Sequence, residues 1–185
     1  MQHYEEKIDK ALQYLKQPSV LSPTGNSPIV YVVYRPEDTF VVRNIVDTFL
    51  TPKAKYYGFE PSLISIGRLV NEYIVSHKYR DVWEDPSYGE KEIYDSIKQE
   101  ISRSCLFEKA LMDAQKTLAD KGNGLIVLKD VEMLHPFYMM GVIENKIYNQ
   151  IKMPVLVLYP GEAQGAARSF LNIYQQDGNY RSINF

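Results

Sequence analysis

The chain has 185 residues, of which 45% are hydrophobic and 24% are charged, and its formal net charge is -2. These values are typical of one globular domain with a sizeable core. The mild negative charge disfavours a nucleic-acid binder that relies on a broadly basic surface, and the single cysteine, Cys105, excludes an internal disulfide framework and a cysteine zinc site.

The amino-terminal residues 1–25 predict an amphipathic helix followed by a loop. Apolar side chains recur at helical spacing, at Tyr4, Ile8, Ala11, Leu12 and Leu15. The stretch QPSVLSPTGNSP then collects the residues that favour loops. The charged start lacks the apolar centre of a signal peptide, and no apolar run approaches the roughly 20 residues needed to span a bilayer. We therefore expect a cytoplasmic protein without a membrane segment.

The next segment predicts a strand followed by a helix. The β-branched run Ile29–Tyr34 indicates a buried strand, and Pro36 suits the first helical position, with Glu37 and Asp38 in the first turn. A helix with one apolar face should follow and end at Pro52. The residues expected on that face are Phe40, Val41, Ile45, Phe49 and Leu50.

The central part of the chain predicts a second strand, Ser62–Ile66, and a helix that begins near Gly67. The stretch YRDVWEDPSYG breaks the helical pattern, so 79–90 is interpreted as a surface insertion. A long helical region should run from Glu90 to Asp120, with a weak point at 102–104, and Cys105 is expected to be buried there. Its inner face is expected to contain Ile93, Ile97, Ile101, Leu111 and Leu118.

The remaining elements alternate in the same way. Apolar runs at Leu125–Leu128 and Val155–Tyr159 predict central strands, and a helix is expected between them at 137–150. Pro160-Gly161 should turn the chain, 166–173 should form a short helix, and 180–184 a last strand. This alternation predicts a single three-layer α/β sandwich over 1–185, with a mostly parallel sheet of about four to five strands.

A strand, a tight loop and a helix in this order give the outline of a P-loop NTPase, but the loop YRPEDT lacks the phosphate-binding features. It contains no glycine and no lysine, and Pro36 removes a backbone donor. Glu37 and Asp38 place negative charge at the helix end that would attract an anion. We predict that this loop starts a helix and binds no phosphate. The alternative is that Arg35, Glu37 and Asp38 contact a partner or a metal at the carboxyl edge of the sheet.

Two acidic residues, Asp130 and Glu132, follow the third strand, where an NTPase would hold Mg²⁺. Without a phosphate loop these acids have no evident catalytic task, so loop or helix-cap roles are favoured. His135 precedes Pro136 and is interpreted as a structural hydrogen-bonding residue, because no second histidine or cysteine lies near it. The sequence contains no catalytic triad and predicts no catalytic residue, no metal site and no cofactor.

The segment VLVLYPGEAQGAAR allows two interpretations. It is either a tight turn or a ligand loop in which Glu162 and Arg168 make contacts at the carboxyl edge. The loops at 35–38, 130–135 and 160–164 should gather on that edge.

The 15 tyrosines suit protein interfaces, because tyrosine combines a large apolar face with a polar tip. The candidate interface residues are Tyr79, Trp83 and Tyr88 in the surface insertion. The alternative is that Trp83 folds back into the core beside the long helix.

Four segments together resemble the BrxB family of the bacterial BREX phage-defence systems. They are VVYRPEDTFVVRNIVDTFL, LKDVEMLHPFYMMGVIENKI, MPVLVLYPGEAQG and GNYRS, in this order, and the likeness runs from Ile29 to Phe185. The last segment departs from the family pattern, because it has one tyrosine where members usually have two.

The resemblance implies a small non-catalytic component of a multi-gene defence system. Its neighbours there would be a large ATPase, a phosphatase-like PglZ protein and a DNA methyltransferase, and direct nucleic-acid binding is not expected. The resemblance adds His135, Tyr159, Tyr180 and Arg181 to the candidate binding residues. The competing interpretation is a nucleotide- or nucleic-acid-binding module with unorthodox ligand residues.

Overall fold

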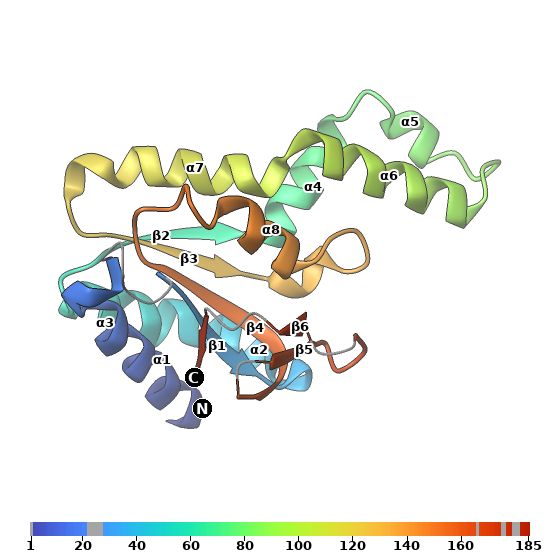
Figure 1. Ribbon diagram of the computed structural model, residues 1–185. Coiled ribbons are helices and arrows are strands. Elements are labelled where there is room, and N and C mark those ends of the chain that lie inside the picture. The colour runs from blue at the N-terminus through green and yellow to red at the C-terminus, as the bar shows by residue number, and fades with distance from the viewer. Residues whose placement is uncertain (1, 22–27, 166, 175–176, 179–181) are drawn as a thin grey trace.

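A computed structural model describes residues 2–21, 28–165, 167–174, 177–178 and 182–185. Five parallel strands form the centre in the order β2-β3-β4-β1-β7, and β5 and β6 extend β4 in antiparallel fashion (Figure 1). The strands are β1 (Ile29–Tyr34), β2 (Glu60–Ser65), β3 (Gly124–Lys129), β4 (Val155–Gln164), β5 (Ala167–Phe170), β6 (Asp177–Gly178) and β7 (Ile183–Asn184). The predicted α/β class with a mostly parallel sheet is confirmed.

Helices cover both faces of this sheet. The α-helices are α1 (Gln2–Leu15), α2 (Thr39–Ile45), α3 (Thr51–Tyr56), α4 (Ile66–Ser76), α5 (Arg80–Trp83), α6 (Glu90–Ser104), α7 (Leu106–Leu118) and α8 (Met140–Ile147). Short 3-10 turns are η1 (Pro18–Leu21), η2 (Pro36–Asp38), η4 (Ala119–Lys121) and η5 (Val131–Leu134), and η3 (Val46–Leu50) is a π-helical turn.

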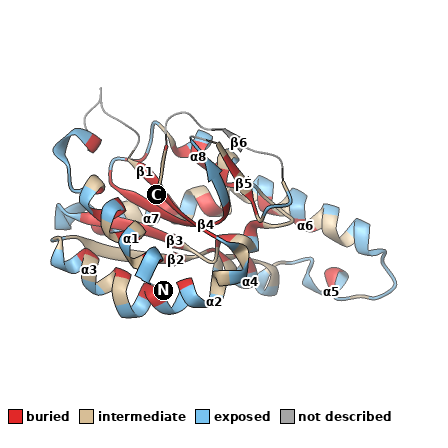
Figure 2. Cartoon of the chain, turned by 90° about the horizontal axis from the view of Figure 1, so that it is seen from below, coloured by how far each residue is buried: buried red, intermediate tan, exposed pale blue. Residues whose placement is uncertain are grey.

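The alternation of side chains along the strands divides the core into two halves. In β1, Tyr31 packs with α4, α6, α7 and α8, whereas Val30 and Val32 pack with α1, α2 and α3. Both halves are apolar, so every residue of β1 is buried. Figure 2 shows the buried strands lying between helices whose outer faces are exposed.

The helix after β1 departs from the prediction in two ways. It does not end at Pro52, because α2, η3 and α3 follow one another without a break from 39 to 56. The π-helical turn lies directly before Pro52, where a proline cannot donate the usual backbone bond. The apolar face is also shifted, since Val42 and Ile45 are buried whereas Phe40 is 80% exposed and Val41 lies at the surface.

The long helical region breaks where the sequence indicated. Cys105 separates α6 from α7 and adopts a left-handed backbone conformation with φ of 52°. Its side chain is half-buried, so the expected full burial is wrong. The helix expected at 137–150 is shorter and spans only α8.

The segment after β4 is also different from the prediction. Pro160-Gly161 does not turn the chain, because β4 continues through it to Gln164. The helix expected at 166–173 is absent from the described residues there, and β5 pairs with the end of β4 instead. Gly161 has a φ of +153° and allows the close approach of β5. A Cβ at this position would lie 1.8 Å from the carbonyl oxygen of Ser169.

Candidate functional site

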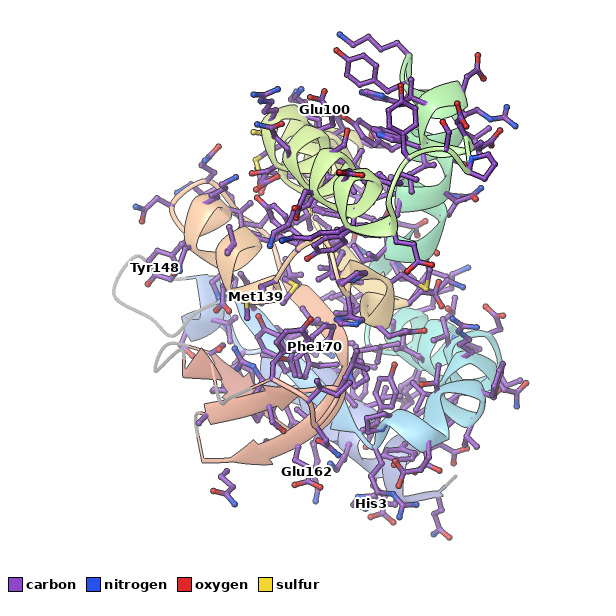
Figure 3. All side chains as sticks on the ribbon, turned by 90° about the vertical axis from the view of Figure 1, so that its right-hand side faces the viewer. His3, Glu100, Met139, Tyr148, Glu162 and Phe170 are labelled. Carbon is purple, nitrogen blue, oxygen red and sulfur yellow. The ribbon has the colours of Figure 1, made fainter. Side chains whose placement is uncertain are left out.

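A groove of about 830 Å³ lies at the carboxyl ends of β1 and β4. In an open parallel sheet this edge is the usual place for a ligand. Figure 3 looks onto this edge and shows His3 and Glu162 at its lower border. The lining residues come from α1, the end of β1 and the loop after it, α2, the end of β4, and β7 with the residue after it: His3, Tyr4, Lys7, Val33, Tyr34, Arg35, Asp38, Val41, 161–165, Asn184 and Phe185.

The charges of the loop after β1 are paired within the loop. The Arg35 guanidinium lies 3.0 Å from the carboxylate of Asp38 and 3.6 Å from that of Glu37. Tyr4 donates its hydroxyl to Asp38 at 2.5 Å, and this hydrogen bond lowers the pKa of Asp38. As expected, the loop begins a helix at Pro36, through η2. Its acids stabilise the helix start, and their local partners leave little charge for a ligand.

An arginine from α2 pairs with both acids that follow β3. Arg43 lies 2.9 Å from Asp130 and 2.7 Å from Glu132. Ser65 also donates to Asp130 at 2.5 Å. Burial alone would lower the pKa of Arg43, but the two carboxylates outweigh it and raise this pKa. The position at which an NTPase would hold Mg²⁺ is therefore occupied by an internal ion-pair cluster.

His135 belongs to a chain of aromatic contacts rather than to the groove. Its Nδ1 forms a short hydrogen bond with the hydroxyl of Tyr174, and its peptide bond to Pro136 is cis. Tyr174 stacks on Phe170, and Phe170 contacts Tyr159 at a centroid distance of 5.3 Å. These contacts join η5 to β4 and β5 and agree with the interpretation of His135 as a structural hydrogen-bonding residue, which stays a prediction.

Arg168 is not the exposed ligand contact that the sequence suggested. It is 3% exposed, and its guanidinium lies 3.6 Å from the centroid of the Tyr31 ring. It donates to Ser182 at 2.8 Å and to Asn184 at 2.9 Å, and lies 3.5 Å from the fully buried Glu144. Burial of an arginine requires such partners. Arg168 therefore ties β5 to β7 and α8 beneath the groove.

Tyr31 completes this buried cluster. Its hydroxyl donates to the Glu144 carboxylate at 2.6 Å. Burial, followed by the nearby Glu144 charge, raises the pKa of Tyr31. A protonated tyrosine and an arginine therefore share one Glu144 carboxylate oxygen.

Of the other predicted residues, Glu162 is exposed on the groove border, with Asn172 at 3.5 Å, and Tyr159 is buried. The loops at 35–38 and 160–164 do meet at the groove, whereas His135 lies apart from it. Tyr180 and Arg181 lie outside the described residues.

The surface insertion forms an arm of α5 and the start of α6, which extends away from the sheet (Figure 1). Trp83 is 7% exposed, stacks on His77 at 4.5 Å and donates to Ser96 at 2.9 Å. The exposed position expected for Trp83 is therefore wrong, and the alternative of a buried ring holds. Tyr79 and Tyr88 are exposed, as expected.

Comparison with known families gives one match. The family model described as "BREX protein BrxB" matches residues 64–185, which is more than half of the chain. The chain belongs to the BrxB family. Membership makes it a component of a BREX phage-defence system. No curated protein and no solved structure matches the chain.

The BrxB match divides the candidate residues into two groups. Asp130, Glu144, Tyr159, Glu162 and Arg168 lie inside the matched range. The loop after β1 precedes it, although the resemblance noted in the sequence extended back to Ile29. The family match therefore includes Glu144 and Arg168 of the buried cluster and the strand extension of β4, but neither Tyr31 nor the amino-terminal side of the groove.

Sequence reasoning missed three residues of this BrxB-family chain. Lys7 and Arg43 lie on amphipathic helices, where charged residues usually face solvent. Glu144 lies on the buried side of α8. The available signal was Glu144 at helical spacing from the apolar Met140 and Ile147.

Within the described residues, no group of three His, Cys, Asp or Glu side chains could hold a metal ion. In the same part of the chain, no helix has the length and apolar character that crossing a membrane requires.

Proposed function

We propose that this BrxB-family chain is a non-catalytic assembly subunit, which binds another protein of its BREX system. The observation that carries the proposal is the pairing of Arg43 with Asp130 and Glu132 at 2.9 and 2.7 Å. An acid that serves Mg²⁺ must offer its oxygens to the ion, whereas these oxygens bind an arginine. The fold keeps the outline of an NTPase, but Arg43 pairs with the two acids at the position where an NTPase would hold its metal ion.

The arm is the surface that best suits a protein partner. Tyr79, Val82 and Tyr88 are exposed on it, together with Val75 at the end of α4. Aromatic residues are enriched at the centres of protein interfaces, because they bury a large area at a small entropic cost. Trp83 lies against the ring of Tyr79, at a centroid distance of 6.3 Å, and its hydrogen bond to Ser96 joins α5 to α6. The arm thus presents an apolar surface on a rigid support.

The partner is expected among the proteins that the family resemblance implies: the PglZ-like phosphatase-fold protein, the large ATPase and the methyltransferase. The chain would work with them in the cytoplasm.

The test is co-purification of the tagged chain from cells that carry the whole BREX gene set. The wild-type chain should retain a BREX protein, and the double variant Tyr79→Ala/Tyr88→Ala should lose it without a change in melting temperature. Tyr56→Ala is the matched control, because Tyr56 is 78% exposed on α3, away from the arm. Absence of any BREX protein, or equal retention by the arm variant, would contradict the proposal.

Calorimetry with ATP and Mg²⁺ tests the competing nucleotide-binding function. The proposal expects no binding heat at physiological nucleotide concentrations. Micromolar stoichiometric binding that disappears in an Asp130→Asn variant would favour the nucleotide-binding function instead.

A further inference from the structure

The end of β4 forms one wall of the groove, and no strand among the described residues lies beside Gly161–Ala163 on that side. The last residue of β1, Tyr34, pairs with Pro160. From Gly161 to Ala163, β4 continues beyond β1, and the strand described beside it there is β5, on its other side. The chain leaves β1 at Arg35, whose N–H donates to the hydroxyl of Tyr4 at 3.3 Å. The groove therefore lies where a continuation of β1 would run.

The backbone groups that face the groove can be identified from two hydrogen bonds. Successive residues of a strand direct their N–H and C=O groups to opposite neighbours. The N–H of Val155 donates to Pro28 on the β1 side, so every second residue from Val155, including Gly161 and Ala163, faces that side. The carbonyl of Pro160 accepts from Leu171, which independently places the intervening residues on the β5 side. Ala163 thus turns its N–H and C=O toward the groove.

Lys7, which forms no ion pair with the described residues, lies in the same groove. The Lys7 ammonium donates to the backbone carbonyl of Val33 at 2.8 Å. No carboxylate among the described residues lies within 4.0 Å of it, whereas Asp38 in the same groove is already paired with Arg35. Burial lowers the pKa of Lys7, which is the behaviour of an ammonium group that lacks a compensating charge.

We infer that the groove is a docking site for an extended segment of a partner protein, which pairs with Gly161–Ala163 as an added strand and places a carboxylate beside Lys7. Strand addition is a common way of binding peptides, because main-chain hydrogen bonds supply affinity and neighbouring side chains supply specificity. The three residues of this edge span roughly 10 Å at about 3.3 Å per residue, so the paired part of the ligand is short. The inference rests on the proposed function and adds the chemistry of the bound segment.

Charge complementarity selects this occupant over others. A single carboxylate would form an ion pair with Lys7, which no described residue does, whereas the several negative charges of a nucleotide's phosphates would also meet Asp38 and Glu162 in the same groove. A peptide uses the groove-facing backbone of Ala163 as well, which a free anion does not need. Val41 lies at the surface in the groove lining and offers apolar contact to the side chains of such a segment.

The test uses fluorescent 12-residue peptides that overlap along the other proteins of the same BREX system, with binding to the full chain measured by fluorescence anisotropy. At least one peptide should bind, and changing its acidic residues to amides should weaken binding at least tenfold. Lys7→Gln should weaken it by a similar factor. Lys10→Gln is the matched control, because Lys10 is an exposed lysine of the same helix.

Two measurements address the strand edge itself. Ala163→Pro removes a backbone N–H that faces the groove and leaves the hydrogen bonds between β4 and β5 in place. It should abolish peptide binding while the melting temperature stays near that of the wild type. Amide hydrogen exchange at Ala163 in the wild-type chain should slow at least tenfold when the peptide is added. The exchange measurement remains decisive if the proline variant fails to fold.

The outcomes separate this inference from the proposed function. If a full-length BREX protein co-purifies but no peptide binds, the docking site is wrong and the assembly role stands. If neither binds, both are wrong. Peptide binding that is indifferent to Lys7→Gln, or displacement of the peptide by millimolar ATP in competition, would also overturn the assignment.

Discussion

Replacement of Arg168 with alanine is expected to destabilise the fold severely. Arg168 and Glu144 are 3% and 0% exposed, and their charged groups lie 3.5 Å apart. Alanine would leave the Glu144 carboxylate buried with Tyr31 as its hydrogen-bond donor and with no positive charge beside it. Removing one partner of a buried ion pair typically costs about 3–5 kcal/mol, because the other charge stays desolvated.

Further losses come from the strands that Arg168 connects. Its hydrogen bonds to Ser182 and Asn184, at 2.8 and 2.9 Å, tie β5 to β7. Each is worth about 0.5–1.5 kcal/mol, although these contributions do not add fully to the first. With a urea dependence of roughly 2 kcal/mol per molar, a loss of about 4 kcal/mol moves the unfolding midpoint down by about 2 M.

Urea denaturation followed by far-UV circular dichroism measures this loss directly. The double variant Arg168→Ala/Glu144→Gln should recover at least about 1 kcal/mol relative to Arg168→Ala, because the stranded charge is removed. Arg103→Ala is the control, since Arg103 pairs with Glu100 at an exposed site and should cost no more than about 1 kcal/mol. If Arg168→Ala unfolds within 1 kcal/mol of the wild type, or if the double variant gains nothing, the buried cluster does not act as described.

Three further perturbations have defined outcomes. Gly161→Ala should lower stability by about 2–4 kcal/mol in thermal unfolding, because its Cβ would meet the Ser169 carbonyl oxygen at 1.8 Å; an unchanged melting temperature would show that β5 moves aside freely. Burial lowers the pKa of Lys7, so the unfolded state holds this proton more tightly than the folded state. The free energy of unfolding of the wild type, relative to that of Lys7→Met, should therefore rise with pH up to about 10.4. If this difference in unfolding free energy stays flat between about pH 8 and 10.5, the desolvation of Lys7 is refuted. Trp83→Ala should lower the free energy of unfolding by about 3–5 kcal/mol in urea denaturation, because a buried indole and its hydrogen bond to Ser96 are lost. An unchanged free energy of unfolding would show that the indole is not buried.

The strands could be predicted because their signal is local. Ile29–Tyr34, Leu125–Leu128 and Val155–Tyr159 are apolar on both faces, as central parallel strands must be. Their parallel direction also follows from the alternation with helices. The helix break at Cys105 was indicated by the serines before it.

The errors arose where long-range contacts override local preference. Pro160-Gly161 favours a turn, but β5 supplies an antiparallel partner that keeps the chain extended. Arginine usually lies at the surface. Arg168 can be buried because Glu144, Ser182 and Asn184, which lie elsewhere in the sequence, provide its polar partners. Such partners are invisible in a single sequence, because residue type alone does not reveal which charges meet.

The central claim is that the chain acts by binding and not by catalysis at the NTPase-like position. Phage plaquing on BREX-positive cells, in which a variant replaces the wild-type chain, tests this most directly. The double variant Asp130→Asn/Glu132→Gln should keep phage protection, because these acids pair with Arg43, Ser65 and Tyr34 of the same chain. Tyr79→Ala/Tyr88→Ala should lose protection at an unchanged protein level. Loss of protection in the first variant at a normal protein level, with full protection in the second, would contradict the account.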